Sequence, residues 1–255
     1  MNWATRRRVI YAVTTIITLI AVFLYFYSDK LFPAPTCFDK KMNGYETGVD
    51  CGGVCSLMCT QEINPISSKW ALALRTASTT YDLVSLISNK NINNSPLGLN
   101  YKFTVYDKLG SVILEKIGQT LVPVDSDFPV IIQNVDLKTP PANTTISFAN
   151  ERHYKTLEKP TSPTIRVINT TFENSSIPKV YVKIQNTKFS TVKNISVRVI
   201  LYDSNQNAIG AGETFIDSLK GEEQKDLVFT WNYPFSERSP QIRVYPILNP
   251  FASAN

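Results

Sequence analysis

Residues 99–107 read LNYKFTVYD, and this stretch decides the fold class. Its large apolar side chains alternate with polar ones and stand at Leu99, Tyr101, Phe103 and Val105. Successive side chains of a β-strand point to opposite faces of a sheet, so a period of two predicts a strand with one buried face. The closing Tyr-Asp pair predicts the end of that strand, where the tyrosine packs and the aspartate starts an Asx-turn.

The pattern returns 96 residues later, where residues 199–203 read VILYD. Upstream, Ile87-Ser-Asn89 matches Ile184-Gln-Asn186 at nearly the same offset, which is about the length of one immunoglobulin domain. Further alternating runs lie at 180–184, 195–201 and 227–231, and together with regularly spaced turn residues they are typical of sandwiches. We therefore predict an all-β protein with two tandem immunoglobulin- or fibronectin-III-like sandwiches.

The polar segment 150–163 separates the two copies and contains two prolines. Trp70 and Trp231 lie in alternating stretches and are expected in the cores. Composition then divides the chain into a cytoplasmic N-terminus (1–8), a transmembrane helix (9–27), a cysteine-rich stalk (28–61), a first sandwich (62–155), a linker (156–163), a second sandwich (164–250) and a tail (251–255).

The transmembrane prediction comes from residues 9–27, which read VIYAVTTIITLIAVFLYFY and contain no charged side chain. At ~1.5 Å per residue such a helix spans about 28 Å, close to the ~30 Å thickness of a hydrocarbon core. Residues 6–8 are three arginines, whereas Asp29 and Lys30 on the other side cancel. Since positive charge resists translocation, we expect a single-pass signal-anchor in the cell membrane with a cytoplasmic N-terminus and an extracellular bulk.

A cleaved signal peptide is the alternative interpretation of this run. The run is longer than the ~7–15 apolar residues of a typical signal peptide and lacks a small-x-small cleavage site. It ends in Tyr25, Phe26 and Tyr27, which suit the aromatic belt at a membrane interface. These features favour an uncleaved anchor.

All four cysteines follow the run closely, at Cys37, Cys51, Cys55 and Cys59. Exported thiols oxidise, so two disulfides are expected, with three pairings left open. Zinc is the alternative, because four thiolates suit it well. The spacing lacks the Cys-x2-Cys pairs of zinc ribbons and therefore favours disulfides.

The segment 35–55, PTCFDKKMNGYETGVDCGGVC, resembles short DCGG-type cysteine modules of exported proteins, which often follow a membrane anchor. Oxygen ligands lie on this loop at Asp39, Asn43, Glu46 and Asp50. Calcium takes six to eight such oxygens, so calcium binding is one interpretation. The other is that these side chains cap turns by accepting hydrogen bonds from backbone amides.

Residues 81–91, YDLVSLISNKN, and 101–107, YKFTVYD, resemble bacterial FxLYD-type and LEA14-like β-sandwiches, and 180–231 is similar. The resemblance covers roughly residues 65–250. It implies an immunoglobulin- or fibronectin-III-like fold without catalytic residues. Lys90 departs from the pattern, because such proteins often have proline there. The whole layout resembles membrane-anchored surface proteins of bacteria.

No catalytic constellation is recognisable in the sequence. The one histidine, His153, falls in the polar segment between the sandwiches, away from any scaffold that could hold it beside a nucleophile. The net charge of +5 includes the three arginines before the membrane run, and the remainder is too scattered to predict nucleic-acid binding. We therefore expect no enzyme and, calcium aside, no cofactor.

Two functions fit these features. The first is a non-catalytic binding or spacer protein of the cell envelope, with a protein partner in that envelope. The alternative is an accessory subunit of an envelope machine, for secretion, pilus assembly or wall synthesis, which docks through its helix. A docking helix favours small-xxx-small patterns, and only Ala12, Ala21 and the threonines offer any. The first hypothesis is therefore preferred.

Overall fold

The computed structural model describes residues 2–31, 37–55, 57–59, 63–149, 154–156 and 164–251. By its contacts the chain divides into two units, residues 1–55 and 56–255. His153 and all but the first residue of the predicted linker 156–163 lie outside the described residues.

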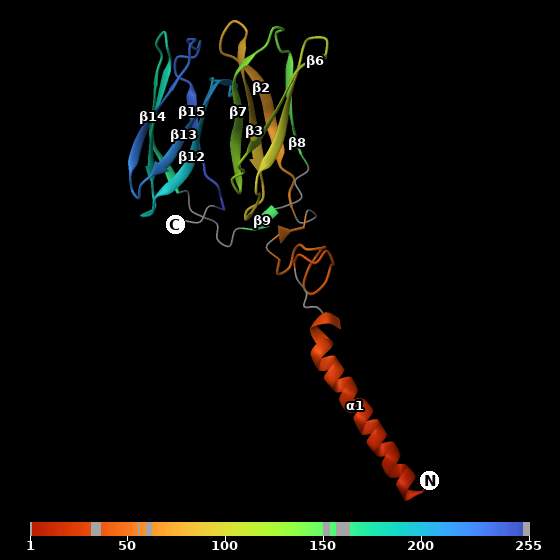
Figure 1. The fold of residues 1–255 in the computed structure, drawn as a ribbon. Helices are drawn as coiled ribbons and strands as arrows, with labels where there is room; N and C mark the ends of the chain where they lie inside the picture. Colours follow the sequence, from red (N-terminus) through yellow and green to blue (C-terminus); the bar gives the residue numbers. More distant parts are fainter. Residues whose placement is uncertain are drawn as a thin grey trace. The chain divides into compact units, whose positions relative to one another are not determined.

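The first unit contains the single helix of the described chain, α1 (Trp3–Leu31) (Figure 1). Its stretch from Thr5 to Tyr27 has a mean hydropathy of 2.4 and is long and apolar enough to cross a membrane. The helix begins before the apolar run, since backbone hydrogen bonding requires no apolar side chain. Thr14 Oγ1 donates to the carbonyl of Ile10 at 3.0 Å, which satisfies the hydroxyl inside the helix.

The second unit is built from antiparallel three-stranded sheets. The first sandwich pairs the sheet β2-β3-β7 with the sheet β6-β5-β8. Its strands are β2 (Ser67–Arg75), β3 (Thr80–Asn89), β5 (Leu99–Tyr106), β6 (Val112–Thr120), β7 (Ser126–Asp136) and β8 (Asn143–Phe148). The predicted strand at 99–107 is β5, the central strand of its sheet.

The second sandwich pairs the sheet β10-β11-β14 with the sheet β13-β12-β15. Its strands are β10 (Ile165–Glu173), β11 (Lys179–Asn186), β12 (Val192–Tyr202), β13 (Ala208–Leu219), β14 (Gln224–Thr230) and β15 (Gln241–Ile247). In both sandwiches the first, second and fifth strands form one sheet, and the fourth, third and sixth form the other. The sequence repeat is therefore a repeat of topology.

A further small sheet is formed by three short strands of the second unit. It has the order β1-β9-β4, with β1 (Leu57–Met58), β9 (Tyr154–Thr156) and β4 (Asn94–Pro96). The strand β1 lies within the segment expected to be stalk, 28–61, yet it pairs with β9. The end of the predicted stalk thus contributes a strand to a sheet.

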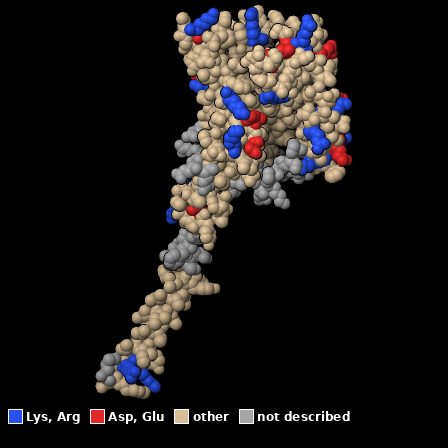
Figure 2. Space-filling model, turned by 180° about the vertical axis from the view of Figure 1, so that it is seen from behind, with Lys and Arg blue, Asp and Glu red and all other residues tan. Residues whose placement is uncertain are grey.

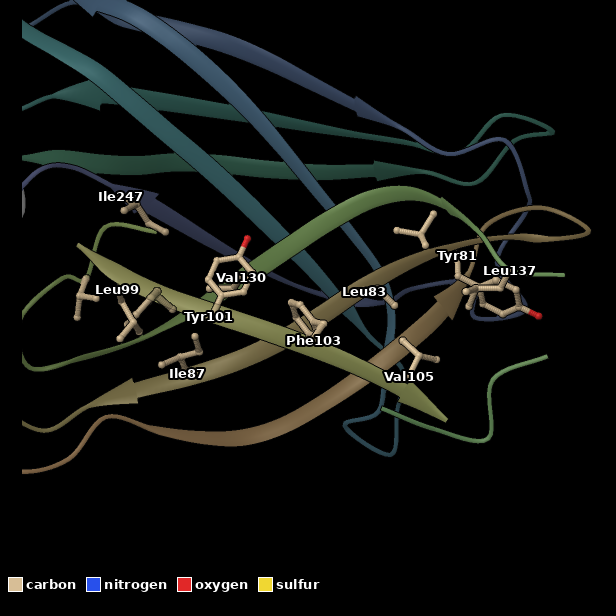
Figure 3. Packing of buried hydrophobic residues seen from close by; sticks show 13 residues of the cluster. Tyr81, Leu83, Ile87, Leu99, Tyr101, Phe103, Val105, Val130, Leu137 and Ile247 are labelled. Atoms are coloured by element: carbon tan, nitrogen blue, oxygen red, sulfur yellow. The ribbon is translucent and has the colours of Figure 1, made fainter. Parts of the chain in front are cut away.

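Each sandwich has its own hydrophobic core. In the first, Phe103 and Val105 from β5 share one cluster with Leu83 and Ile87 from β3 (Figure 3). One member, Ile247, comes from the last residue of β15 in the second sandwich. The second core includes the apolar positions whose alternation predicted strands, among them Val180, Val182, Ile184, Ile195, Val197, Val199 and Leu201.

Trp231 lies in the second core, as predicted, and is 7% exposed. Its Nε1–H donates to the carbonyl of Ala211 at 3.0 Å. A Cβ added at Gly212 would meet the ring of Phe229 at 2.9 Å, so this glycine lets β13 approach the aromatic side chains closely.

The repeated asparagines, Asn89 and Asn186, tie the ends of equivalent strands to the loops beside them. Asn89 Nδ2 donates to the carbonyls of Pro123 (2.9 Å) and Asn94 (3.3 Å). Asn186 Nδ2 donates to three carbonyls, of Ser190 (2.8 Å), Leu219 (3.1 Å) and Lys220 (2.9 Å). Both are buried, so each side chain replaces water as the partner of these carbonyls.

The Tyr-Asp pairs end their strands in turns, as the sequence predicts. Asp107 Oδ1 accepts hydrogen bonds from the amides of Leu109 and Ser111, at 2.8 and 2.9 Å. Asp203 Oδ1 accepts from Asn205 and Asn207, at 2.9 and 2.7 Å. These Asx-turns are structural, and they account for both aspartates of the repeat.

Candidate functional site

A third hydrophobic cluster joins the two sandwiches. Its buried residues come from the outward faces of the sheets β2-β3-β7 and β13-β12-β15, and they are Val84, Leu86, Ile131, Ile200, Tyr202, Ala208 and Ala211, with Trp70, Leu74 and Tyr245 packed against them. These two sheets, named the inner sheets below, therefore bury both faces. The other two, β6-β5-β8 and β10-β11-β14, are the outer sheets, and together the four form stacked layers (Figure 1).

A buried arginine crosses this inter-sandwich interface. Arg198 on β12 is 8% exposed, and its Nε donates to Glu213 Oε1 at 2.7 Å. Its Nη1 reaches the first sandwich, where it donates to Thr120 Oγ1 at 3.2 Å and to the carbonyl of Pro129 at 2.6 Å. Ser196 Oγ also donates to Glu213 Oε1, at 2.7 Å. The planar guanidinium thus fixes how the two inner sheets are aligned.

An aromatic pair lies in the same interface. The rings of Trp70 on β2 and Tyr202 on β12 meet edge to face, with centroids 6.4 Å apart. The Arg243 guanidinium lies 4.6 Å from the centroid of the Tyr202 ring. Burial, the largest cause, raises the pKa of Tyr202. Contacts of this kind add to the apolar burial across the interface.

The sequence pattern did not predict this contact. It indicated two modules joined by a linker, with Trp70 in a sandwich core. Trp70 instead packs against the inter-sandwich cluster and is half-buried. The signal that could have revealed the interface is the run from Ile195 to Tyr202, ISVRVILY, where apolar residues also occupy the second face. Strands buried on both faces have such continuous apolar runs.

Asp82 is a buried acid on the inner strand β3, 3% exposed. Its Oδ1 accepts a hydrogen bond from the amide of Asn134 at 2.9 Å. Asn134 has a φ of 59° and lies beside a register shift between β3 and β7. Burial raises the pKa of Asp82, and the bond from Asn134 opposes this rise. The carboxyl group thus supports a β-bulge.

A groove of about 440 Å³ lies between the sandwiches, lined by residues 123–128 of the first and by 164–165, 244–248 and Pro250 of the second. Asp127 in this lining forms an ion pair with Lys69. Burial raises the pKa of Asp127, but the hydrogen bond and the positive charge of Lys69 oppose it, and the pKa is lowered. No histidine or cysteine is among the described lining residues, so a serine there has no imidazole beside it.

The charged surface is mixed. Figure 2 shows lysines and arginines interspersed with acids over the visible face of the sandwiches, without a broad field of one sign. Exposed pairs include Lys102 with Glu115 (2.7 Å) and Lys183 with Asp226 (3.5 Å). A nucleic-acid interface needs a basic stripe, which this face does not present.

The four cysteines are all disulfide-bonded, as predicted, which removes the thiolates that zinc would need. Cys37 pairs with Cys55 across a Cα–Cα distance of 5.6 Å, and Cys51 and Cys59 are also disulfide-bonded. The Glu46 carboxylate lies within 4.8 Å of the Cys37 and Cys55 sulfurs. Because both sulfurs belong to a disulfide, that group offers a metal one carboxylate only.

The carboxylates of the segment 37–55, named the Cys loop below, face its own backbone. Asp50 Oδ1 accepts from the amides of Asp39 (2.9 Å) and Lys40 (3.1 Å). Asp39 Oδ1 accepts from the amide of Lys41 at 2.9 Å, and its Oδ2 from Asn43 Nδ2 at 2.8 Å. Glu46 Oε2 accepts from the amide of Asn43 at 3.1 Å. This geometry supports the turn-capping interpretation, and calcium binding stays a prediction.

A glycine explains part of the DCGG sequence. Gly53 has a φ of 57°, and a Cβ added there would lie 1.7 Å from the carbonyl oxygen of Tyr45. Only glycine fits, because the backbone of residue 53 lies directly against the backbone of Tyr45. The motif is therefore required by the shape of the loop.

Comparison with known proteins identifies no family. No family model matches the chain, and no curated protein matches it. Among the 103 solved chains that match in structure is the crystal structure of red sea bream transglutaminase, with a TM-score of 0.26 and 10% sequence identity. The match covers 74% of this chain, which spans only 30% of that chain. A likeness this weak bears on neither fold nor function.

Proposed function

We propose that the protein is a non-catalytic spacer or binding protein of the cell envelope, anchored by its helix with the N-terminus in the cytoplasm and the sandwiches outside. The observation that supports a spacer most strongly is the Arg198 network across the inter-sandwich interface. It makes the two sandwiches one stiff four-layer body. Such a body holds its end loops and outer sheets at a constant mutual position, which suits presentation to a partner.

The proposed topology is supported by two independent features. Disulfides persist in an oxidising compartment, so the bonded cysteines between residues 37 and 59 support a position of this segment outside the cytoplasm. The arginines at 6–8 lie at the opposite end of the apolar span and favour the cytoplasmic side. Both features imply the same direction of crossing.

The bonding of the ionisable side chains supports the non-catalytic assignment. Asp82 supports a bulge, and Arg198 with Glu213 holds the interface. Asp107 and Asp203 start turns. Each group is bonded to protein atoms that give it a structural task, whereas catalytic groups face a cleft where a substrate can reach them.

Two experiments test this function. With epitope tags at both ends, protease added to intact cells should remove the C-terminal tag and spare the N-terminal one; the reverse would refute the topology. The purified full chain should show no turnover of ester, phosphoester, peptide or glycan substrates. Activity that is lost on changing one acidic residue, with an unchanged melting temperature, would refute the non-catalytic assignment.

A further inference from the structure

The Cys loop exposes an unusual number of large apolar side chains for its length. Five of them have between 56% and 82% of their surface exposed, and they are Phe38, Met42, Tyr45, Val49 and Val54. They point outward because the interior of so small a loop is filled by disulfides and capped turns. So many exposed apolar side chains on one short loop favour a role in contact with something else.

The acidic and basic side chains of the loop also differ in exposure. Its acids Asp39, Glu46 and Asp50 are half-buried and turned toward backbone amides. Lys40 and Lys41 are exposed. The loop therefore presents a basic and aromatic surface, although it contains more acids than bases. This combination suits the anionic and amphipathic boundary layer of a lipid bilayer.

The length of chain before the loop places it near such a layer. Only residues 32–36 separate the last helical residue, Leu31, from Cys37. Six extended steps reach at most about 20 Å, and the four helical residues after Tyr27 add about 6 Å. The headgroup layer itself is ~5–8 Å thick on each side of the core. The loop is thus tethered within reach of the membrane surface.

We propose that the Cys loop is a membrane-contact module, which seats Phe38, Tyr45 and Val54 in the lipid interface with Lys40 and Lys41 at the headgroups. Aromatic side chains with a polar end prefer this layer. A second contact beside the helix restrains the base of the ectodomain. This inference depends on the proposed membrane anchor and adds a lipid-binding surface to it.

The test uses the full chain reconstituted into vesicles that contain anionic phospholipid and lipids brominated on the acyl chains. Tyr45→Trp is compared with Leu109→Trp, both in a Trp3→Phe background. Leu109 is a matched control, because it is 91% exposed at the tip of the β5–β6 hairpin in an outer sheet. Brominated lipid should quench at least half of the fluorescence that Tyr45→Trp adds, and little of what Leu109→Trp adds.

Equal quenching of the two variants would overturn the proposal. Phe38→Trp provides a second reporter if Tyr45→Trp fails to form its disulfides. Lys40→Glu with Lys41→Glu should reduce the quenching at least twofold, and unchanged quenching would refute the role of the lysines. Flotation of the vesicles separates the two proposals: chain that does not float refutes the anchor, whereas floating chain without quenching refutes the loop contact alone.

Discussion

In both sandwiches the third strand has a basic residue at the equivalent position, Lys102 or Arg198, and it pairs with a glutamate of the fourth strand, but the surroundings are opposite. In the first, Lys102 on β5 pairs with Glu115 on β6 at 2.7 Å, and both side chains are more than 40% exposed. In the second, Arg198 on β12 pairs with Glu213 on β13 at 2.7 Å, and they are 10% and 13% exposed. One pair lies on an outer sheet, and the other lies on an inner sheet.

Neighbouring positions differ in the same sense. Thr104 on the outer strand β5 corresponds to Ile200 on the inner strand β12. Lys183 on the outer strand β11 corresponds to Leu86 on the inner strand β3. The interface therefore joins two unlike faces of similar modules, and these equivalent positions on the outer sheets are polar. Unlike faces could otherwise stack further copies, and polar side chains such as Lys102 and Lys183 on the outer sheets oppose this.

Among the variants that separate inner from outer sheets, Arg198→Ala should lose the most stability. It leaves Glu213 buried without its counter-charge and leaves the Pro129 carbonyl without its partner. Removal of one member of a buried ion pair typically costs about 3–5 kcal/mol. Urea unfolding followed by circular dichroism should show this loss. A loss below about 1 kcal/mol would mean that the inner pair behaves as a surface pair.

Trp70→Ala removes the aromatic contact with Tyr202 at the interface. We expect a loss of about 3 kcal/mol, the low end for a tryptophan, because Trp70 is only half-buried. Calorimetry should also show the single transition separating into two, since the sandwiches lose cohesion while each keeps its core. Ile117→Ala on the outer strand β6, where the side chain is 78% exposed, should change neither quantity.

Asp82→Asn tests how the buried acid of the inner sheet makes stability depend on pH. The folded-state pKa of Asp82 is raised by burial, so its contribution to stability is greatest below its ordinary pKa of 3.8 and is lost as pH rises through the folded value. The variant keeps an acceptor for Asn134 and should match or exceed the parent at pH 7 by about 1 kcal/mol or less.

The opposite pH trend is expected at an exposed turn. Hydrogen bonds from Asn207, and then from Asn205, lower the pKa of Asp203. Asp203→Asn should therefore lose stability relative to the parent above pH 4, and the difference should vanish in acid. Melting temperatures of the parent and both variants between pH 3 and 7 would measure these trends. Parallel trends for the two variants would contradict the assigned environments.

Lys102→Ala should have the smallest effect. The exposed pair with Glu115 is screened by solvent and is expected to contribute about 0–1 kcal/mol. Urea unfolding of this variant beside Arg198→Ala compares equivalent basic residues in an outer and an inner sheet. Equal losses in the two variants would remove the distinction between the sheets.

Local patterns predicted much of this structure. Alternation identified strands such as β5 and β11, and the offset of the Tyr-Asp ends revealed that the topology repeats. Confinement of four cysteines to one loop predicted their oxidation. The pairing of those cysteines depends on the path of the loop, and spacing alone leaves it open.

The inter-sandwich contact is much harder to predict from the sequence. Its faces interleave apolar residues with Asp82, Ser196 and Arg198, so the second face of each inner strand looks partly polar in sequence. Only their partners make these residues compatible with burial, and those partners are distant in the chain, as Thr120 is from Arg198. Long-range pairing of this kind is visible in three dimensions alone.

The most direct test of the inter-sandwich interface is to cut the chain between the sandwiches. A protease site is introduced within residues 157–163, the purified protein is cleaved there, and the product is examined by analytical ultracentrifugation at micromolar concentration. The inter-sandwich interface predicts that both fragments sediment as one particle of the uncut mass, and that Arg198→Ala lets them separate. Fragments that separate at once in the parent would show that the sandwiches are independent modules without a stable interface.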